Sequence, residues 1–279
     1  MLRSMYAGIS GMKGFQTNLD VIGNNIANVN TSGFKKGRVT FQDMMSQTTS
    51  GAQGPTDTRG GTNPAQVGLG SQLGSIDNIH TQGFRQTTEN PLDLALEGDG
   101  MFILEADGTT YYTRAGNFYL DEGDAGEDGA RIVNPDGYFL QGFSNLGDDE
   151  FSDTVSNIII PNDARSFSIQ ENGNVNYVNA AGENEVAGRI SLANFSNPAG
   201  LEKAGSNLFL DSENAGYNGS VAPGDDGTGS IVSGSLEMSN VDLSEEFTEM
   251  ITAQRGFQAN TRIITTSDEI LQELVNLKR

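Results

Sequence analysis

Apolar residues recur at intervals of three or four positions at both ends of the chain, and the residues between the two ends show no similar pattern. The N-terminal set comprises Leu2, Met5, Ile9, Met12, Phe15, Leu19, Ile22, Ile26 and Val29. The C-terminal set follows a heptad grid and comprises Leu243, Phe247, Met250, Phe257, Ile264, Leu271 and Val275. This spacing places each set on one face of a helix. Two arrangements fit the pattern: exposed seams that pack against other copies of the chain, or two core helices that meet inside one domain.

The two predicted helices have recognisable ends. Asn30-Thr-Ser-Gly33 is a helix-breaking cluster whose glycine can adopt a left-handed conformation, so the first helix is expected to stop near residues 28–33. Asp242 is a candidate N-cap of the second helix, and Glu245 follows it three residues later. The polar residues that interrupt the heptad grid of this helix are Gln254, Thr261 and Asp268. The grid is therefore too polar for a simple two-stranded coiled coil and fits a helix with several neighbours.

The middle of the chain shows the signals of β-hairpins. Short apolar runs flank Asp107-Gly108, Asp136-Gly137 and Asn172-Gly173, dipeptides that accept the positive φ angles of tight turns. Residues 158–160 and 190–195 are expected to form further buried strands. Several short strands with regular turns predict a small sandwich or barrel.

Two Gly-rich stretches, 46–75 and 214–235, separate this middle from the terminal helices, and the first shows neither helical nor strand periodicity. We therefore predict an α+β protein with long terminal helices and an inserted, mainly β middle. Its expected regions are an N-terminal helix at 1–33, an extended Gly-rich arm at 34–75 joined by 226–239, a β-rich outer domain at 76–225, and a C-terminal helix at 240–279 that pairs with the first.

Composition and charge narrow the class of protein. The chain has 279 residues, no cysteine and 35% hydrophobic residues, and it has no apolar run long enough to span a bilayer. We expect no cleavable signal peptide, because the start of the chain is amphipathic. The formal net charge is −21, which argues against a nucleic-acid-binding protein. Residues 1–38 contain five Lys or Arg and one acid, whereas residues 236–279 contain four Lys or Arg and eight acids, and these opposite net charges favour attraction between the two ends.

Little in the sequence points to catalysis. His80 is the sole histidine, so a Ser-His-Asp triad has one possible base, and a surface or packing role is the default for it. Metal sites built on His or Cys are excluded by count. The acidic run at 121–128 misses the spacing of a calcium loop and is expected to be a solvated hairpin tip. We therefore predict no catalytic residue, no metal site and no cofactor, and a protein that is not an enzyme.

Three groups of motifs closely resemble those of the bacterial flagellar rod and hook family. The first is Leu19-Asp-Val-Ile-Gly-Asn-Asn-Ile-Ala-Asn-Val-Asn-Thr-Ser-Gly-Phe-Lys35, extended by Phe41-Gln-Asp43 and Ser46-Gln47. The second comprises Asn90-Pro-Leu-Asp-Leu-Ala95 and Tyr112-Thr-Arg-Ala-Gly-Asn-Phe118. The third comprises Ser233-Gly-Ser-Leu-Glu237, Ser239-Asn-Val-Asp-Leu243 and Met250-Ile-Thr-Ala-Gln-Arg-Gly-Phe-Gln-Ala-Asn260.

This resemblance implies a mechanical role. The terminal helices would form a coaxial, coiled-coil-like inner tube around an export channel. The polymerisation seam would comprise Leu2, Met5, Ile9, Met12, Leu19, Ile22, Ile26, Phe247, Met250, Phe257, Ile264, Leu271 and Val275. The family-signature residues that shape the helix end and its contacts would be Asn24, Asn25, Ala27, Asn28, Gly33, Phe34 and Lys35. Such a polymer requires an interface that does not close into a ring.

Within the family, the sequence favours a hook subunit that forms a curved, flexible tube and transmits torque as a universal joint. The supporting motifs are Val241-Asp-Leu-Ser-Glu-Glu246, Phe257-Gln258 and Val275-Asn-Leu-Lys278. The alternative is a distal rod subunit of the basal body. Expected partners are other copies of the chain, rod and hook–filament junction proteins, the hook cap and the flagellar export apparatus. The expected location is the extracellular part of the flagellum, without membrane insertion.

Two other classes remain open on the residues alone. One is a secreted carbohydrate-binding or adhesive β protein with helical tails, which would bind through aromatic residues of the middle and stay monomeric. The other is a hydrolase that uses acidic residues. Electron microscopy of concentrated protein separates the three classes, because tubes are expected from the polymer alone.

Overall fold

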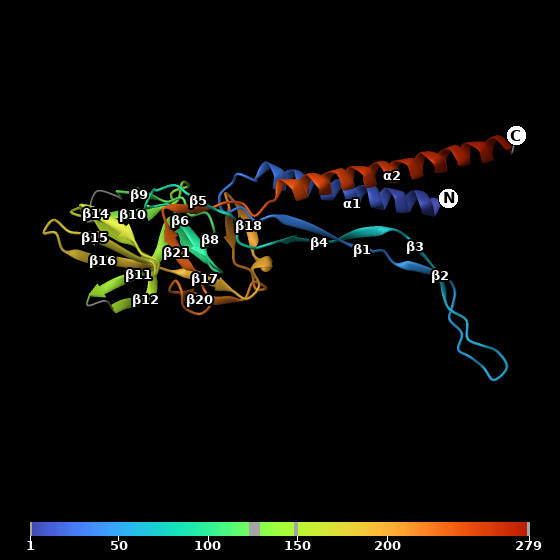
Figure 1. Cartoon of the computed structure of the whole chain (residues 1–279). Helices are drawn as coiled ribbons and strands as arrows, with labels where there is room; N and C mark the ends of the chain where they lie inside the picture. Colours follow the sequence, from blue (N-terminus) through green and yellow to red (C-terminus); the bar gives the residue numbers. More distant parts are fainter. Residues whose placement is uncertain (1, 123–128, 148–149, 278–279) are drawn as a thin grey trace. The chain divides into compact units, whose positions relative to one another are not determined.

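A computed structural model describes residues 2–122, 129–147 and 150–277. The chain divides into two compact units (Figure 1). The helical unit comprises Met1–Ala27, Gly37–Ile79 and Asp242–Arg279, and the β unit comprises Asn28–Lys36 and His80–Val241. Two terminal helices thus flank a large, mostly β middle, as predicted.

The helical unit holds the two long helices, α1 (Leu2–Ala27) and α2 (Leu243–Leu277). Asp242 caps α2 as predicted, because its Oδ1 accepts the backbone N–H groups of Ser244 at 2.8 Å and Glu245 at 3.4 Å. Helix α1 ends at Ala27, next to the predicted boundary, and the carbonyl of Asn28 accepts the N–H of Thr31 in the turn that follows.

The two helices run antiparallel and pack closely through glycines. A Cβ atom at Gly8 would lie 3.3 Å from Cγ1 of Ile264, and one at Gly11 would lie 2.9 Å from Nδ2 of Asn260. Residues later in α1 therefore meet residues earlier in α2. Because these glycines lack a side chain, the backbone of α1 can approach α2 closely.

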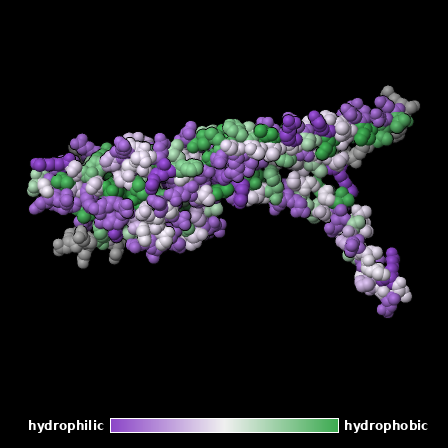
Figure 2. All heavy atoms as spheres, viewed as in Figure 1, coloured by the Kyte–Doolittle hydropathy of each residue, from purple (hydrophilic) through white to green (hydrophobic). Residues whose placement is uncertain are grey.

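Residues 37–79 form paired strands, which corrects the prediction of an arm without strands. Strand β1 (Gly37–Asp43) pairs antiparallel with β4 (Ser71–Asn78), and β2 (Ser46–Ser50) pairs with β3 (Ala65–Gly68). Every side chain of β2 and β3 is exposed, so neither strand has the apolar alternation from which strands are recognised. The far end of this hairpin is hydrophilic (Figure 2).

The second part of the predicted arm, residues 226–239, belongs to the β unit. Strand β21 (Ser230–Ser233) pairs with β6 (Leu94–Glu97), and β22 (Ser235–Glu237) pairs with β5 (Arg85–Thr87). These pairings tie the segment to the strands that begin the β unit. Of the predicted arm 34–75, only residues 34–36 share this unit with it, whereas 37–75 lie in the helical unit.

The remaining strands of the β unit are short and antiparallel. They are β7 (Met101–Ala106), β8 (Thr109–Thr113), β9 (Tyr119–Asp121), β10 (Gly129–Val133), β11 (Phe139–Gly147), β12 (Glu150–Asn157), β13 (Ile159–Pro161), β14 (Ser166–Ile169), β15 (Asn174–Val178), β16 (Asn184–Ile190), β17 (Leu192–Phe195), β18 (Glu202–Gly205), β19 (Leu208–Leu210) and β20 (Tyr217–Val221), with a 3₁₀ turn at Pro198–Gly200. They form one branched network whose main path runs β14-β15-β16-β11-β7-β8-β19-β18.

The three predicted hairpin turns are confirmed. Strands β7 and β8 flank Asp107-Gly108, β10 and β11 flank Asp136-Gly137, and β14 and β15 flank Asn172-Gly173. The glycine of each dipeptide has a positive φ angle. The acidic run expected at a hairpin tip lies mostly outside the described residues, since 123–128 are not among them.

The β unit has a large apolar core. Its fully buried members include Leu94, Phe102, Leu104, Phe118, Ile132, Leu140, Ile158, Ile190, Leu192 and Ile231. The rings of Phe102 and Phe118 meet edge to face with centroids 5.3 Å apart. The core includes residues from both apolar runs predicted to be buried, although 190–195 divides between the end of β16 and β17 rather than forming one strand.

Candidate functional site

The first candidate site is the surface of the helical unit, where the predicted polymerisation seam lies. On α1, Ile22 is buried, Ile9 is exposed, and the others whose side chains are described are half-buried, namely Met5, Met12, Leu19 and Ile26. On α2, the half-buried members are Met250, Phe257, Ile264 and Leu271, whereas Phe247 and Val275 are exposed. The side chain of Leu2 is not among those described.

The half-buried members of α2 lie on the face that meets α1. Ile264 lies against Gly8 of α1. Phe15 of α1 lies against Gly256, the residue that precedes Phe257 in the sequence. Ala253 and Ser267 are buried on the same face. The apolar stripe read from the sequence is thus used, at least in part, within one chain. Its role in polymerisation remains a prediction.

A second apolar stripe on α2 has no covering partner within the described part of the chain. Ile263, Ile270, Leu274 and Leu277 follow one another at intervals of seven, four and three residues and are 44%, 49%, 49% and 82% exposed. Phe247 and Ile251 form another exposed pair, 50% and 58% exposed. Figure 2 shows hydrophobic patches, in green, on the visible surface along the helices. None of the four residues of this second stripe belongs to the C-terminal set identified from the sequence, although the same helical spacing also marks the stripe.

The signature residues near the end of α1 divide between the two units. In the helical unit, Asn25 is buried and its Nδ2 donates to the carbonyl of Gly37 at 2.9 Å and to Oε2 of Glu246 at 3.1 Å. Its Oδ1 accepts the N–H of Gly37 at 3.0 Å. Asn25 therefore joins both helices to the start of β1. Asn24 and Ala27 are exposed.

The segment 28–36 is held firmly in the β unit. Gly33 has a φ of +69°, and a Cβ there would collide with the backbone of Ala115. Phe34 is buried, and the ammonium of Lys203 lies 5.2 Å from the centre of its ring. Asn28 begins the segment and accepts the hydroxyl of Thr31 at 3.1 Å. These contacts give Gly33 and Phe34 positions that other residues would not fill easily.

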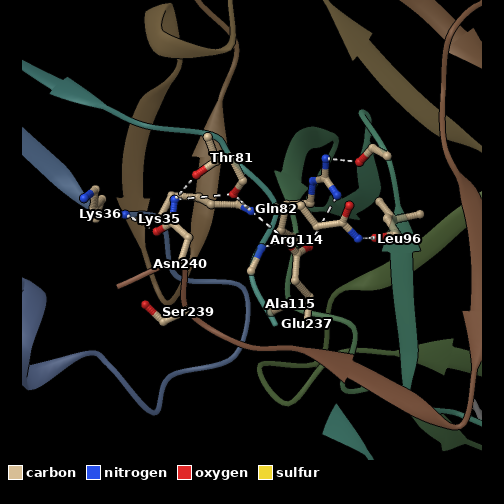
Figure 3. A network of polar contacts seen from close by, with 12 residues as sticks. Lys35, Lys36, Thr81, Gln82, Leu96, Arg114, Ala115, Glu237, Ser239 and Asn240 are labelled. Atoms are coloured by element: carbon tan, nitrogen blue, oxygen red, sulfur yellow. Dashed lines mark hydrogen bonds and ion pairs between the residues drawn. The ribbon is translucent and has the colours of Figure 1, made fainter. Parts of the chain in front are cut away.

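The second candidate site is a buried cluster of charges in the β unit, drawn in Figure 3. Nζ of Lys35 lies 2.7 Å from Oε1 of Glu237, and Nη1 of Arg114 lies 3.3 Å from Oε2 of the same carboxylate. The three side chains are 0%, 5% and 2% exposed for Lys35, Arg114 and Glu237. Here one carboxylate is shared by two cations.

Backbone groups complete the cluster. Lys35 Nζ donates to the carbonyl of Thr81 at 2.8 Å, and Arg114 Nη2 donates to the carbonyl of Gly98 at 2.7 Å. Glu237 Oε1 also accepts the N–H of Gly83 at 3.0 Å. Burial lowers the pKa of Lys35 and of Arg114, and the negative charge of Glu237 opposes the shift in both.

Further hydrogen bonds surround the charges. The N–H of Lys36 donates to Oδ1 of Asn240 at 2.8 Å, and Nδ2 of Asn240 donates to Oγ1 of Thr81 at 2.9 Å. The N–H of Gly33 donates to the carbonyl of Glu237 at 2.8 Å. The segments that contain Lys35, Thr81 and Glu237 are thus connected directly.

His80 lies beside this cluster and has a packing role. Its ring centre is 5.6 Å from that of Phe209, and both ring nitrogens are buried without a hydrogen-bond partner. Burial lowers its pKa to about 4, and the positive charges of Lys35, Arg114 and Lys203 act in the same direction. This environment keeps His80 neutral at pH 7.

No pattern in the sequence predicted the cluster. Lys35 belongs to the family signature, whereas Arg114 and Glu237 lie within longer motifs and carry no signal of their own. Among the described residues there is no group of three or more His, Asp or Glu side chains placed to hold a metal ion. No helix in the described part of the chain is long and apolar enough to cross a membrane.

Three family sequence models match successive parts of the chain. The model described as "Flagella basal body rod protein" matches residues 5–35, "Flagellar hook protein FlgE/F/G D1 domain" matches 95–177, and "Flagellar basal body rod FlgEFG protein C-terminal" matches 232–277. Lys35, Arg114 and Glu237 each fall in a different matched segment. The buried cluster is therefore where the three segments meet.

Individual relatives extend over the whole chain. The flagellar basal-body rod protein FlgG of Bacillus subtilis is 55% identical over 280 residues, with 100% of both chains covered. FlgG of Caulobacter vibrioides is 39% identical over 281 residues, with 99% of this chain and 100% of the relative covered. The flagellar hook protein FlgE of Borreliella burgdorferi is 33% identical over an alignment of 441 residues that covers 100% of both. These relatives are structural flagellar proteins, and this chain belongs to the flagellar rod and hook protein family.

Proposed function

We propose that this chain is a subunit of the distal flagellar rod and polymerises through its helical unit into a tube that encloses an export channel. The lengths of the relatives support the rod over the hook. Alignments with two rod proteins span 280 and 281 residues, whereas the hook alignment spans 441 although this chain has 279. The hook relative thus carries a long stretch that this chain lacks, and the rod alternative replaces the hook as the preferred function.

The structural observation that carries the proposal is the second apolar stripe of α2. Ile263, Ile270, Leu274 and Leu277 are all more than two-fifths exposed. Complete burial of a large apolar side chain contributes about 1.5–3 kcal/mol, so covering this stripe would favour association. In a self-assembling protein, the partner that covers this stripe is a second copy of the chain.

Charge favours contact between helices of different copies. Helix α1 carries Arg3, Lys13 and Asp20 as its charged residues, so its net charge is positive. Helix α2 is acidic; its charged residues are Glu245, Glu246, Glu249, Arg255, Arg262, Asp268, Glu269 and Glu273. Surfaces of opposite charge favour a heterologous contact, in which two different faces of the subunit meet. Such a contact produces an open helical polymer when it does not close into a ring.

The remaining parts of the functional hypothesis follow from the rod assignment. The neighbours along the axis would be other rod proteins and the hook. The chain would reach the assembling end through the flagellar export apparatus and work in the part of the flagellum outside the cytoplasmic membrane. No catalytic step or cofactor is needed for this role.

Genetic complementation tests the assignment. The chain is expressed in one Bacillus subtilis strain that lacks FlgG and in another that lacks its hook protein. Restored swimming in the first strain alone is the expected result. Restoration in the second strain alone would support the hook instead. Purified, concentrated protein examined by electron microscopy adds an independent test, because a rod subunit should form straight tubes, and curved tubes or a lasting monomer would contradict the proposal.

A further inference from the structure

The β unit is built from two separate stretches of chain, 28–36 and 80–241. The polypeptide therefore passes between the units after residues 27, 36, 79 and 241. The covalent connections between the helical unit and the β unit lie at these points. Contacts close to these points hold the connecting segments against the β unit.

Three of the four points border the buried cluster. Lys35 and Lys36 precede the second point, Thr81 and Gly83 follow the third, and Glu237 and Asn240 precede the fourth. The close view in Figure 3 shows these segments linked by hydrogen bonds to one another and to Arg114. Arg114 follows strand β8 directly, so it fastens the segments to the main sheet.

Glu237 is the shared partner in this arrangement. One carboxylate oxygen accepts bonds from Lys35 Nζ and the N–H of Gly83, and the other accepts a bond from Arg114. Glu237 therefore bonds to all three of these groups. Loss of the carboxylate would leave two buried cations close together without their anion, which is far more costly than loss of an exposed pair.

We propose that Glu237 is the positioning residue of a joint that fixes, in the β unit, the chain segments leading to the helical unit. The proposal rests on the rod assignment for its purpose, because a shaft that carries torque loads the chain segments that connect the parts of each subunit. In that role the joint keeps these segments bound to the β unit when force is applied to them. The stability of the sheet itself comes mainly from its apolar core.

Hydrogen exchange in the purified, full-length monomer tests the joint directly. The informative amides are those of Gly33, Lys36, Gly83 and Met238, whose N–H groups bond within or beside the cluster. The reference amides are those of Ile190 and Ile231, whose N–H groups bond to the carbonyls of Gly173 and Glu171. In Glu237→Gln, we expect about 100-fold faster exchange at the first set and little change at the second.

Two further variants make the test specific. Lys35→Met removes one cation and leaves Arg114 paired with Glu237, so it should fold even if Glu237→Gln does not, and it should accelerate exchange at the same joint amides. Lys35→Met combined with Glu237→Gln restores the original net charge of the cluster and should exchange more slowly than Glu237→Gln alone. Glu97→Gln is the matched control, because its pair with Arg85 is 3.1 Å long but exposed.

The outcomes separate a joint from a general stabiliser. Faster exchange confined to the joint amides supports the proposal. Equal acceleration at the joint and at Ile190 and Ile231, or no acceleration in either Glu237→Gln or Lys35→Met, overturns it. Because the measurement is made on the monomer, it does not depend on whether the wild-type chain forms tubes or restores swimming, and failure of the rod assignment is detected separately.

Discussion

The ring of Phe15 on α1 lies directly over the backbone of Gly256 on α2: a Cβ atom at position 256 would be 2.5 Å from Cζ of that ring. The two helices therefore pack through a ring on one and a bare backbone on the other. Real Cβ atoms do not come so near a neighbour, so any larger residue at 256 forces the ring or a helix to move. The contact fixes both the spacing and the register of the pair.

Gly256→Val should weaken the pairing of α1 with α2. Forcing extra methyl groups into a packed contact costs about 1–3 kcal/mol. Thermal unfolding of the monomer, followed by circular dichroism at helical wavelengths, should show the loss. The control is Gly23→Ala, since a Cβ at Gly23 in α1 has nothing within 4 Å and alanine favours a helix by about 1 kcal/mol. Equal stability of Gly256→Val and the wild type would mean that the helices separate easily in solution.

An added carboxylate should affect the stability of the monomer differently on the two faces of α2. Ile264→Asp places a carboxylate on the face that packs near Gly8 and is expected to weaken the helix pair within the monomer. Ile270→Asp places it on the exposed stripe and should leave monomer stability within about 0.5 kcal/mol. Assembly should fail in both variants. Sedimentation measures the yield of tubes, and thermal melting of the monomer shows whether the helix pair itself is weakened, as expected for Ile264→Asp alone.

The matched control for the exposed stripe is Thr265→Asp. Thr265 is also exposed, and it lies on α2 away from the line of Ile263, Ile270 and Leu274. Introducing the same charge there should reduce tube yield far less than Ile270→Asp. Similar losses from the two variants would show that added negative charge on α2, rather than the apolar stripe, governs assembly.

Local patterns in the sequence were sufficient for much of the fold. Both terminal helices follow from apolar periodicity, and the hairpins at Asp107-Gly108, Asp136-Gly137 and Asn172-Gly173 follow from the backbone conformations that these dipeptides accept. Strands β2 and β3 escaped prediction because all their side chains are exposed, so backbone hydrogen bonds hold them without an apolar face.

The buried cluster escaped prediction for a different reason. Lys35 and Glu237 are 202 residues apart, and Arg114 and Glu237 are 123 apart. Charged residues at such separations form no periodic signal, and most charged side chains are solvated. Likewise, periodicity placed Ile264 and Phe257 on a helix face without saying whether that face meets α1 or another copy. The glycines of α1 were the available clue, because small residues permit close helix contact.

His80 should make folding stability depend on pH between about 4 and 6.5. Its pKa is about 4 in the folded protein and 6.5 in an unfolded chain. In this range the unfolded chain binds more protons, so stability falls as the pH is lowered, by up to about 3 kcal/mol. Burial of the ring is the main cause of this lowered pKa; the positive charges of Lys35, Arg114 and Lys203 lower it further, and the negative charge of Glu237 opposes them.

Nuclear magnetic resonance can measure this pKa without ambiguity, because His80 is the sole histidine. The matching stability experiment compares urea unfolding of the wild type and of His80→Phe at pH 6.5 and 4.5. The variant retains an aromatic ring next to Phe209 and cannot titrate, so it should lose less stability at the lower pH. A measured pKa near 6.5 would show that the ring is solvated in solution.

Gly33→Ala should release the segment 28–36 from the β unit. Gly33 has a φ of +69°, which disfavours alanine, and the added methyl group would also collide with the backbone of Ala115. Gly182→Ala isolates the first effect, because Gly182 has a φ of +89° and a Cβ there has nothing within 4 Å. Strain of this kind costs about 1–3 kcal/mol, so Gly182→Ala should stay within that range. Chemical unfolding of the monomer should show a loss for Gly33→Ala that exceeds the loss for Gly182→Ala by at least about 1 kcal/mol. Equal losses would mean that the backbone of Ala115 moves aside, and that Gly33 is required for its conformation alone.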